Sequence, residues 1–357
     1  MSMANELHYI GKRDETNFFV RVLKSVLPWK GDNAAEIFRK AILIGAAAVF
    51  VMSLHQLMEF FQGDEVSNEA IHSVQEIQPD FDTIQQVDPT ANNQGSVGAP
   101  SADGSVVKGM SSMWNDLYKA NGDTIGLISI DTLLNEKGEK IINYAVVKDP
   151  DDNEFYLHNG FYKQKSGYGW IFADYRNRIS PDGNSDNIVI YGHNVRKYAS
   201  MFTRLNEYKS GVDFLQKNPL ITFSTIYDSS KVQWIIVGAF VTNAEAYQDN
   251  GKRFEYWNYI NFNEDYPYDT FISEVKKRSW YTSDIDCSED DEYLTLQTCS
   301  DEVTGFKYVV VARKVRIDDN VDALIASYKE KADEDIYFPA AWTRVYGNKK
   351  IYKGWDI

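Results

Sequence analysis

Cysteine is scarce in this chain, with only Cys287 and Cys299 among 357 residues. Two thiols cannot build the disulfide framework of a small secreted protein, and at most one bridge is possible. Basic residues are outnumbered, since 37 Lys and Arg face 52 Asp and Glu for a formal net charge of -15. Nucleic acid is therefore excluded as a partner, because its binding calls for clustered Lys and Arg. The five histidines are scattered along the chain, so we predict no metal site.

Charge is absent from one stretch: between Ala41 and Met58 there is no Lys, Arg, Asp or Glu. About 20 apolar residues cross a bilayer, so a transmembrane helix is predicted over residues 41–61. A buried core helix and a cleaved signal peptide are the alternatives. Seven Lys and Arg precede the run and none follows it before Lys108. By the positive-inside rule, residues 1–40 are predicted to be cytoplasmic and the remainder extracellular, held at the cell membrane by a single pass.

Large apolar side chains are sparse between residues 62 and 111, where the sequence is polar and acidic. Such a segment buries too little surface to offset its ordering entropy, so a flexible linker is predicted. Residues 112–318 are predicted to form the folded domain. Residues 319–357 form a C-terminal extension for which the sequence indicates no function.

The folded part has ample material for a core, because hydrophobic residues make up 43% and aromatic residues 14% of the chain. Apolar runs recur between turns after Asp123, which predicts a barrel or a sandwich. The predicted strands are 125–130, 141–147, 187–191, 220–226, 233–242, 293–298 and 308–316. Short helices are predicted at 113–119, 200–206, 211–216, 256–262, 268–277 and 321–332.

Cys299 follows directly after the predicted strand 293–298. His193 comes two residues after the predicted strand 187–191. For an isolated thiol, a buried structural cysteine is the plainer interpretation. A Cys and a His at the carboxyl ends of two strands, however, are able to face each other in one cleft. Nucleophilic catalysis by a thiol needs that pairing. Cys287 lies in an acidic stretch that disfavours a thiolate, so we interpret it as incidental.

The residues around both positions resemble the sortase family. The run TLQTC over residues 295–299 resembles the sortase signature TLxTC, and YGHN over residues 191–194 resembles the sortase histidine motif. The resemblance covers roughly residues 112–317. It implies a mainly β fold, a sortase-like closed barrel of about eight strands with a few peripheral helices. Further features resemble class B sortases in particular, namely NGDTIG at 121–126, IFADYRN at 171–177, FEYWNY at 254–259 and the long insertion 243–293.

A third member of the family pattern, an arginine just before a run such as VVVA, is missing here. The run occupies residues 309–312, and Lys307 falls in the place of the arginine. Arg313 lies six residues further, on the order of 20 Å along the strand, so geometry favours Lys307. Arg196, just after the histidine motif, is the alternative. Lysine keeps the charge but not the planar fork of donors, so weaker positioning of the substrate is expected.

The resemblance implies cysteine transpeptidase chemistry without a metal or a cofactor. Cys299 attacks a threonine carbonyl in the C-terminal sorting motif of a secreted protein, Lys307 stabilises the oxyanion, and His193 transfers protons. The acyl group then passes to an amine of a peptidoglycan precursor, or to a pilin amine. The class B resemblance favours cell-wall anchoring over pilus polymerisation.

Two other functions would use the same residues. A cysteine peptidase hydrolyses its thioester with water, whereas a catalytically impaired surface binding module performs no turnover, which the missing arginine would explain. Incorporation of an added amine distinguishes the transpeptidase from the peptidase. Candidate substrate contacts are Tyr191, Asn194, Thr298 and Ser200, with packing or capping as the alternative for Tyr191 and Ser200.

Overall fold

A computed structural model describes residues 18–79 and 107–354 of the chain. Two compact units, residues 1–62 and 63–357, make up the chain. The first unit contains helix α1 (Phe18–Val26) and the greater part of helix α2 (Ala34–Glu76).

One stretch of α2, Ala34–His55, is the only part of the described helices that is long and apolar enough to cross a membrane. It overlaps the predicted transmembrane helix 41–61 but begins earlier. Its apolar side chains are exposed, as in Phe50 and Met52, both 64% accessible. Such a surface is compatible with a lipid environment, where apolar side chains need no protein to cover them.

The predicted linker is partly helical, because α2 continues to Glu76. Ala70, Ile71 and Val74 are buried, and the last two belong to the core of the second unit. Their helical spacing places them on one face, a pattern that the polar average composition of the segment conceals. Met110, at the other end of the predicted linker, is also buried. Residues 80–106 of the predicted linker lie outside the described part of the chain.

The second unit is built on a closed barrel with strand order β1-β2-β3-β4-β10-β11-β8-β7, which confirms the predicted fold class. The pairs β2–β3 and β4–β10 are parallel, and the other neighbours are antiparallel. The barrel strands are β1 (Thr124–Ser129), β2 (Asn143–Val147), β3 (Phe172–Ala173), β4 (Asn187–Tyr191), β7 (Leu220–Thr225), β8 (Gln233–Thr242), β10 (Tyr293–Cys299) and β11 (Lys307–Lys314). Two small ribbons pair β5 (Asn194–Val195) with β6 (Ser200–Met201), and β9 (Tyr281–Thr282) with β12 (Lys329–Glu330).

Seven of the barrel strands coincide with predicted strands, and β3 was missed because it has only two residues. Alternate residues of β11 enter two cores: Val310 and Ala312 join the larger one, whereas Val309 and Val311 join an aromatic cluster with helix α6 (Tyr268–Arg278). Burial on both faces explains why this strand is an unbroken apolar run.

Short helices surround the barrel. Several predicted helices were wrong in extent: residues 200–206 form β6 followed by a 3₁₀ turn, residues 256–262 contain only a 3₁₀ turn, and the helix predicted over 321–332 ends at Ala326 as the chain enters β12. The α-helices are α3 (Asn115–Ala120), α4 (Phe155–His158), α5 (Val212–Lys217), α6 (Tyr268–Arg278), α7 (Val321–Ala326) and α8 (Ala340–Tyr346). The 3₁₀ turns are 112–114, 196–198, 203–209, 246–249, 256–258 and 333–335.

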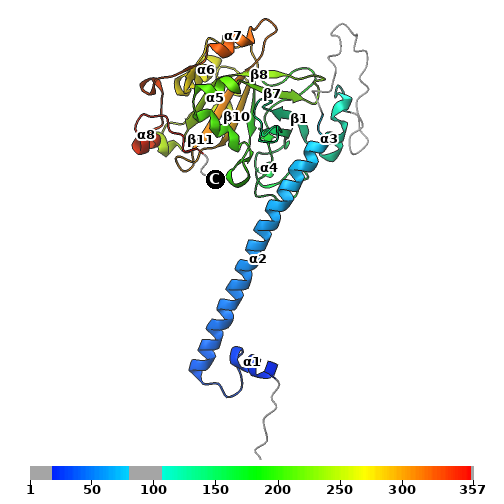
Figure 1. The fold of residues 1–357 in the computed structure, drawn as a ribbon, viewed down its shortest axis with the longest axis vertical. Helices are drawn as coiled ribbons and strands as arrows, with labels where there is room; N and C mark the ends of the chain where they lie inside the picture. The colour runs from blue at the N-terminus through cyan, green and yellow to red at the C-terminus, as the bar shows by residue number, and fades with distance from the viewer. Residues whose placement is uncertain (1–17, 80–106, 355–357) are drawn as a thin grey trace, which may run out of the picture. The chain divides into compact units, whose positions relative to one another are not determined.

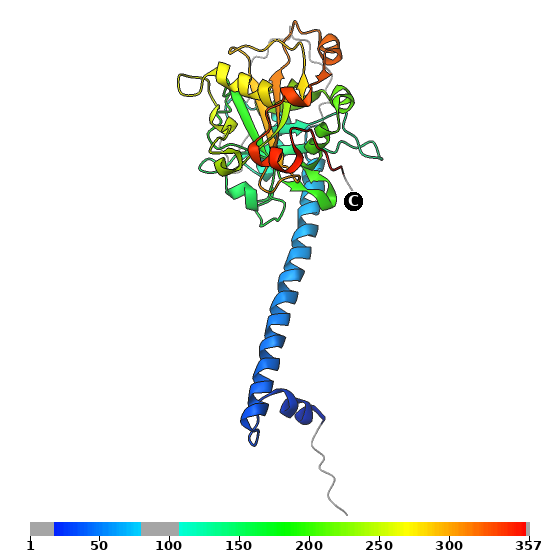
Figure 2. The same cartoon turned by 90° about the vertical axis from the view of Figure 1, so that its left-hand side faces the viewer.

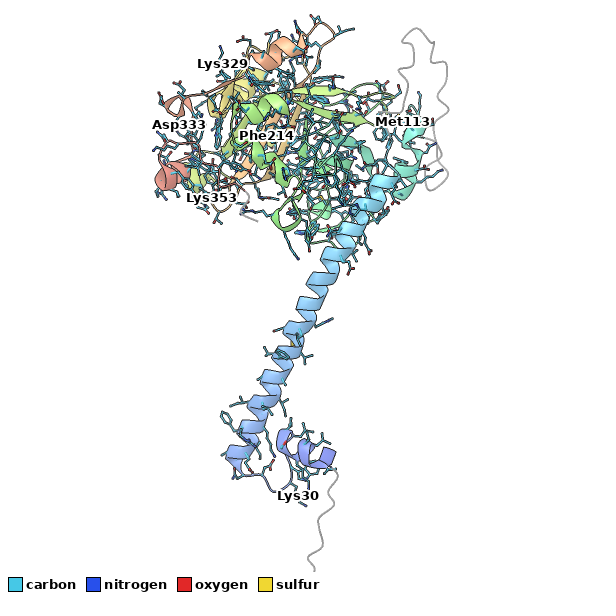
Figure 3. All side chains as sticks on the ribbon, in the orientation of Figure 1. Lys30, Met113, Phe214, Lys329, Asp333 and Lys353 are labelled. Carbon is cyan, nitrogen blue, oxygen red and sulfur yellow. The ribbon has the colours of Figure 1, made fainter. Side chains whose placement is uncertain are left out.

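The C-terminal segment, residues 319–354, packs against the barrel unit. Tyr328, Phe338 and Trp342 are buried in the larger core. Figure 1 shows α8 beside β11, and Figure 2 shows the same helix, in red, on the face of the domain toward the viewer. Lys329, Asp333 and Lys353 mark the course of the segment along this side in Figure 3. The extension is therefore a part of the folded domain.

Candidate active site

Cys299 is the last residue of β10, and the antiparallel register pairs it with Lys307, the first residue of β11. The Lys307 ammonium nitrogen Nζ lies 3.3 Å from the Cys299 sulfur. Residues 300–306, here termed the post-cysteine turn, join the two strands. The turn is closed by the Ser300 N–H, which donates to the Phe306 carbonyl oxygen at 2.9 Å. A negative charge developing near Sγ would therefore meet an ammonium group.

His193 reaches the same edge of the barrel because β4 runs parallel to β10. Tyr191 is paired with Gln297, and the Gly192 N–H donates to the Gln297 carbonyl oxygen at 3.0 Å. His193 lies two residues after Tyr191, and Cys299 lies two residues after its partner Gln297, so both follow the same paired position. The two strand ends are therefore neighbours, and the pairing of the thiol with the imidazole stays a prediction.

The His193 ring is held by a backbone carbonyl. Its Nε2 lies 2.9 Å from the Leu157 carbonyl oxygen. A carbonyl oxygen only accepts, so Nε2 carries the proton and Nδ1 of the neutral ring remains an acceptor. Burial and the nearby charge of Lys307 lower the pKa of His193, and the Leu157 bond opposes them only in part. The ring is therefore neutral at pH 7 and able to accept a proton.

Gly169 makes room for the imidazole. Its φ is +54°, and a Cβ there would lie 2.5 Å from the Tyr156 carbonyl oxygen and 3.0 Å from Cδ2 of His193. The position needs a residue without a side chain for both reasons.

The backbone of the nucleophile candidate is held by two amide side chains. Asn194 Nδ2 donates to the Cys299 carbonyl oxygen at 3.1 Å and to Asp301 at 2.8 Å, and Asn206 Nδ2 donates to the same carbonyl at 3.2 Å. Asn194 thus connects the histidine motif with the post-cysteine turn. Asn206 was not identified from the sequence, and no local signal marks it.

A buried ion pair supports the post-cysteine turn. Lys209 Nζ lies 2.6 Å from Glu302 Oε2 and 3.0 Å from Ser300 Oγ, and the two charged side chains are 1% and 4% exposed. Burial alone would raise the pKa of Glu302, but the Lys209 ammonium and the Ser300 hydroxyl outweigh burial and lower it. The carboxylate is therefore charged at neutral pH. Its partner Lys209 lies in a 3₁₀ turn 93 residues earlier in the chain, so no local sequence pattern indicates this ion pair.

The insertion after β8 supplies an aromatic side chain near the sulfur. Tyr256 is fully buried, and its hydroxyl donates to Gln297. Burial and the neighbouring Cys299 raise its pKa well above the ordinary value, so it remains a neutral donor. The run FEYWNY indicated a class B trait in the sequence but no role for this residue.

The four predicted substrate contacts differ in their surroundings. Thr298 is fully buried, and its hydroxyl has no hydrogen-bond partner among the described residues. The Tyr191 hydroxyl donates to Asp174 at 2.8 Å, which favours the packing interpretation. Ser200 is 8% exposed and lines a separate cavity. Asn194, as described, holds the backbone of Cys299.

That separate cavity has a volume of about 760 Å³ and lies between the end of α2 and the barrel. Its rim includes Gln75, Lys140, Tyr144 and Tyr198, but neither Cys299 nor His193.

Two arginines are the alternatives to Lys307 as substitutes for the missing family arginine. Arg313 is paired with Tyr293 at the opposite end of β11 and is bound to Asp319. Arg196 lies 3.6 Å from Asp301, in the post-cysteine turn. Lys307 has its ammonium nitrogen 3.3 Å from the sulfur, which supports it as the substitute.

A metal has no evident place in residues 18–79 and 107–354, which contain no group of three or more His, Cys, Asp or Glu suited to hold an ion. Both cysteines are free thiols. Cys287 is half-buried, and burial raises its pKa.

Known proteins share this barrel. A family profile described as the Sortase domain matches residues 142–315. Sortase B of Listeria monocytogenes is 32% identical over 190 residues, which are 52% of this chain and 67% of that protein. Sortase B of Staphylococcus aureus is 28% identical over 208 residues, 57% of this chain and 75% of that protein. The crystal structure of sortase B from Bacillus anthracis has the same fold, with a TM-score of 0.51 at 21% identity, over 72% of this chain and 99% of that one.

The chain belongs to the sortase family, and its enzyme class is accordingly that of a transpeptidase. Within the family it is of class B, as the similarity to two sortase B proteins shows. The family and the barrel predicted from the sequence are thereby confirmed. The roles assigned to individual site residues stay predictions.

Proposed function

We propose that this protein is a membrane-anchored cysteine transpeptidase in which Cys299 is the nucleophile, His193 transfers protons and Lys307 stabilises negative charge. The observation that supports this most directly is the 3.3 Å contact between the Lys307 ammonium and the Cys299 sulfur. A thiol needs a base or a cation to react as a thiolate at neutral pH. Here the Lys307 ammonium contacts the sulfur, and His193 follows the end of β4, the strand that pairs with β10.

In the first half-reaction, Cys299 attacks the carbonyl carbon of a threonine in the sorting motif of a secreted protein. A C–S bond forms and the peptide C–N bond breaks. Because His193 is neutral at pH 7, it takes the thiol proton at Nδ1 and passes it to the leaving amine. Lys307 stabilises the oxyanion of the tetrahedral intermediate.

In the second half-reaction, an amine replaces the sulfur on the acyl carbon. His193 accepts the proton of the attacking amine and returns it to the departing thiolate, so the enzyme is regenerated. We assign the amine to a peptidoglycan precursor, in line with the class B similarity, and a pilin lysine is the alternative acceptor. Neither half-reaction calls on a cofactor.

The apolar stretch Ala34–His55 supports a single membrane pass. The Lys and Arg before it support an orientation with the amino terminus in the cytoplasm and the barrel outside the cell. Attachment to the membrane raises the effective concentration of enzyme where secreted precursors and cell-wall precursors meet.

The test uses the full chain in detergent, because buried residues of α2 belong to the core of the barrel unit. It is incubated with a panel of threonine-containing sorting peptides and an oligoglycine amine, and products are identified by mass spectrometry. A peptide–amine product that is absent from Cys299→Ala and retained in Cys287→Ala is expected. Hydrolysis without amine incorporation would indicate a peptidase instead. Lack of any acyl-enzyme in the wild type would contradict the proposal.

A further inference from the structure

The C-terminal segment contacts the post-cysteine turn directly. Phe306, the last residue of the turn, is fully buried, and the indole of Trp342 stacks on it with ring centroids 6.0 Å apart. Tyr346, one helical turn beyond Trp342 in α8, donates its hydroxyl to the Glu302 carbonyl oxygen at 2.8 Å. One face of α8 therefore holds the turn through a ring contact and a hydrogen bond.

A second connection runs through the insertion after β8. Asp249 is 3% exposed and accepts two hydrogen bonds from the C-terminal segment, from the Tyr337 hydroxyl at 2.7 Å and from the Ala340 N–H at 2.9 Å. Its neighbour Gln248 donates to the Thr304 carbonyl oxygen of the post-cysteine turn at 2.8 Å. The segment thus orders the 3₁₀ turn 246–249, which in turn binds the middle of the post-cysteine turn.

Glu302 is held from both sides. Lys209 binds its carboxylate from the barrel side, and Tyr346 binds its backbone carbonyl from the C-terminal segment. The post-cysteine turn, which carries Glu302, begins next to Cys299 and ends next to Lys307. A shift of the turn would therefore change the distance between the sulfur and the ammonium group.

We propose that the C-terminal segment is a positioning element of the active site, which holds the post-cysteine turn so that Lys307 stays beside the Cys299 sulfur. Tyr346 is the positioning residue whose contribution can be isolated, since its hydroxyl donates directly to the turn backbone and can be removed without the ring. This role rests on the proposed function and extends it to a segment that had no assigned part in the reaction.

Deletion of the segment is a poor test, because Trp342 and Tyr328 lie in the core and the truncated chain would lose stability. Tyr346→Phe removes only one hydroxyl. Tyr328→Phe is the matched control, because the Tyr328 hydroxyl also donates from the C-terminal segment to a backbone carbonyl, that of Ile236, at 2.6 Å. Ile236 lies near the far end of the barrel from Lys307, six residues along β8 from the partner of Lys307.

The full chain in detergent is assayed for peptide transfer, for alkylation of Cys299 by iodoacetamide and for thermal unfolding. Tyr346→Phe is expected to lower kcat by about twofold to tenfold, the equivalent of one hydrogen bond, with KM unchanged. Tyr328→Phe is expected to lower the unfolding temperature at least as much and to leave kcat unchanged.

Equal kcat in the two variants would overturn the positioning role. If the wild type transfers no peptide, the proposed function fails separately, and the alkylation rate of Cys299 still decides the present inference. A changed rate in Tyr346→Phe alone supports positioning, and equal rates in both variants contradict it.

Discussion

Removal of the positive charge at Lys307 is the sharpest perturbation of this site. Lys307→Met keeps the length and the apolar stem of the side chain but deletes the ammonium group. At the observed 3.3 Å, a unit charge attracts a full negative charge by about 5 kcal/mol at an effective dielectric constant of ~20. Water that enters the space left by the ammonium group replaces part of this stabilisation. The expected decrease in kcat is therefore about 10² to 10³-fold, as for the loss of one oxyanion donor.

Lys314→Met is the matched control, because Lys314 ends the same strand and forms an ion pair with Glu292 at the other edge of the barrel. Lys307→Arg restores the fork of donors and is expected to transfer peptide at least as fast as the wild type. Peptide transfer is measured as amine-product formation by mass spectrometry. Turnover in Lys307→Met equal to that in Lys314→Met would refute the assignment.

Three further outcomes are expected. Gly169→Ala forces a Cβ against the ring of His193 and is expected to lower kcat, as measured by peptide transfer. Gly167→Ala, where the added carbon meets nothing within 4 Å, is the control and is expected to leave kcat unchanged. Lys307→Met removes a charge that lowers the pKa of His193, so that pKa rises and the His193 limb of the pH–activity profile moves to higher pH. Burial would raise the pKa of Asp131, but a hydroxyl and two ammonium groups lower it to about 2. The ionised Asp131 therefore contributes stability above pH 4 that is lost as pH falls toward 2. Asp131→Asn is expected to lower the free energy of unfolding, measured with urea at pH 7, by about 1–2 kcal/mol. A difference in this free energy between variant and wild type that persists at pH 2 would contradict the prediction.

Local pattern was enough to predict most of the barrel strands, although Lys307 lies just outside the predicted strand 308–316. β4 and β8 were predicted with their observed ends, because each is an apolar run longer than four residues bounded by polar turns. Helices were predicted less well. Residues 256–262 contain amphipathic spacing but form only a 3₁₀ turn, since aromatic packing against β8 and β10 decides their backbone.

The sequence by itself determined the family, the strand-end positions of Cys299 and His193, and the lysine in place of the expected arginine, because these follow from residue type and order. The contact between Lys307 and the sulfur depended on strand register, which local sequence specifies only through the turn. Only the tertiary structure decided that the end of α2 and the C-terminal segment belong to the barrel unit. Buried side chains of both segments, such as Val74 and Trp342, join a core whose other members are mostly distant in the chain, and local sequence does not indicate which distant residues they meet.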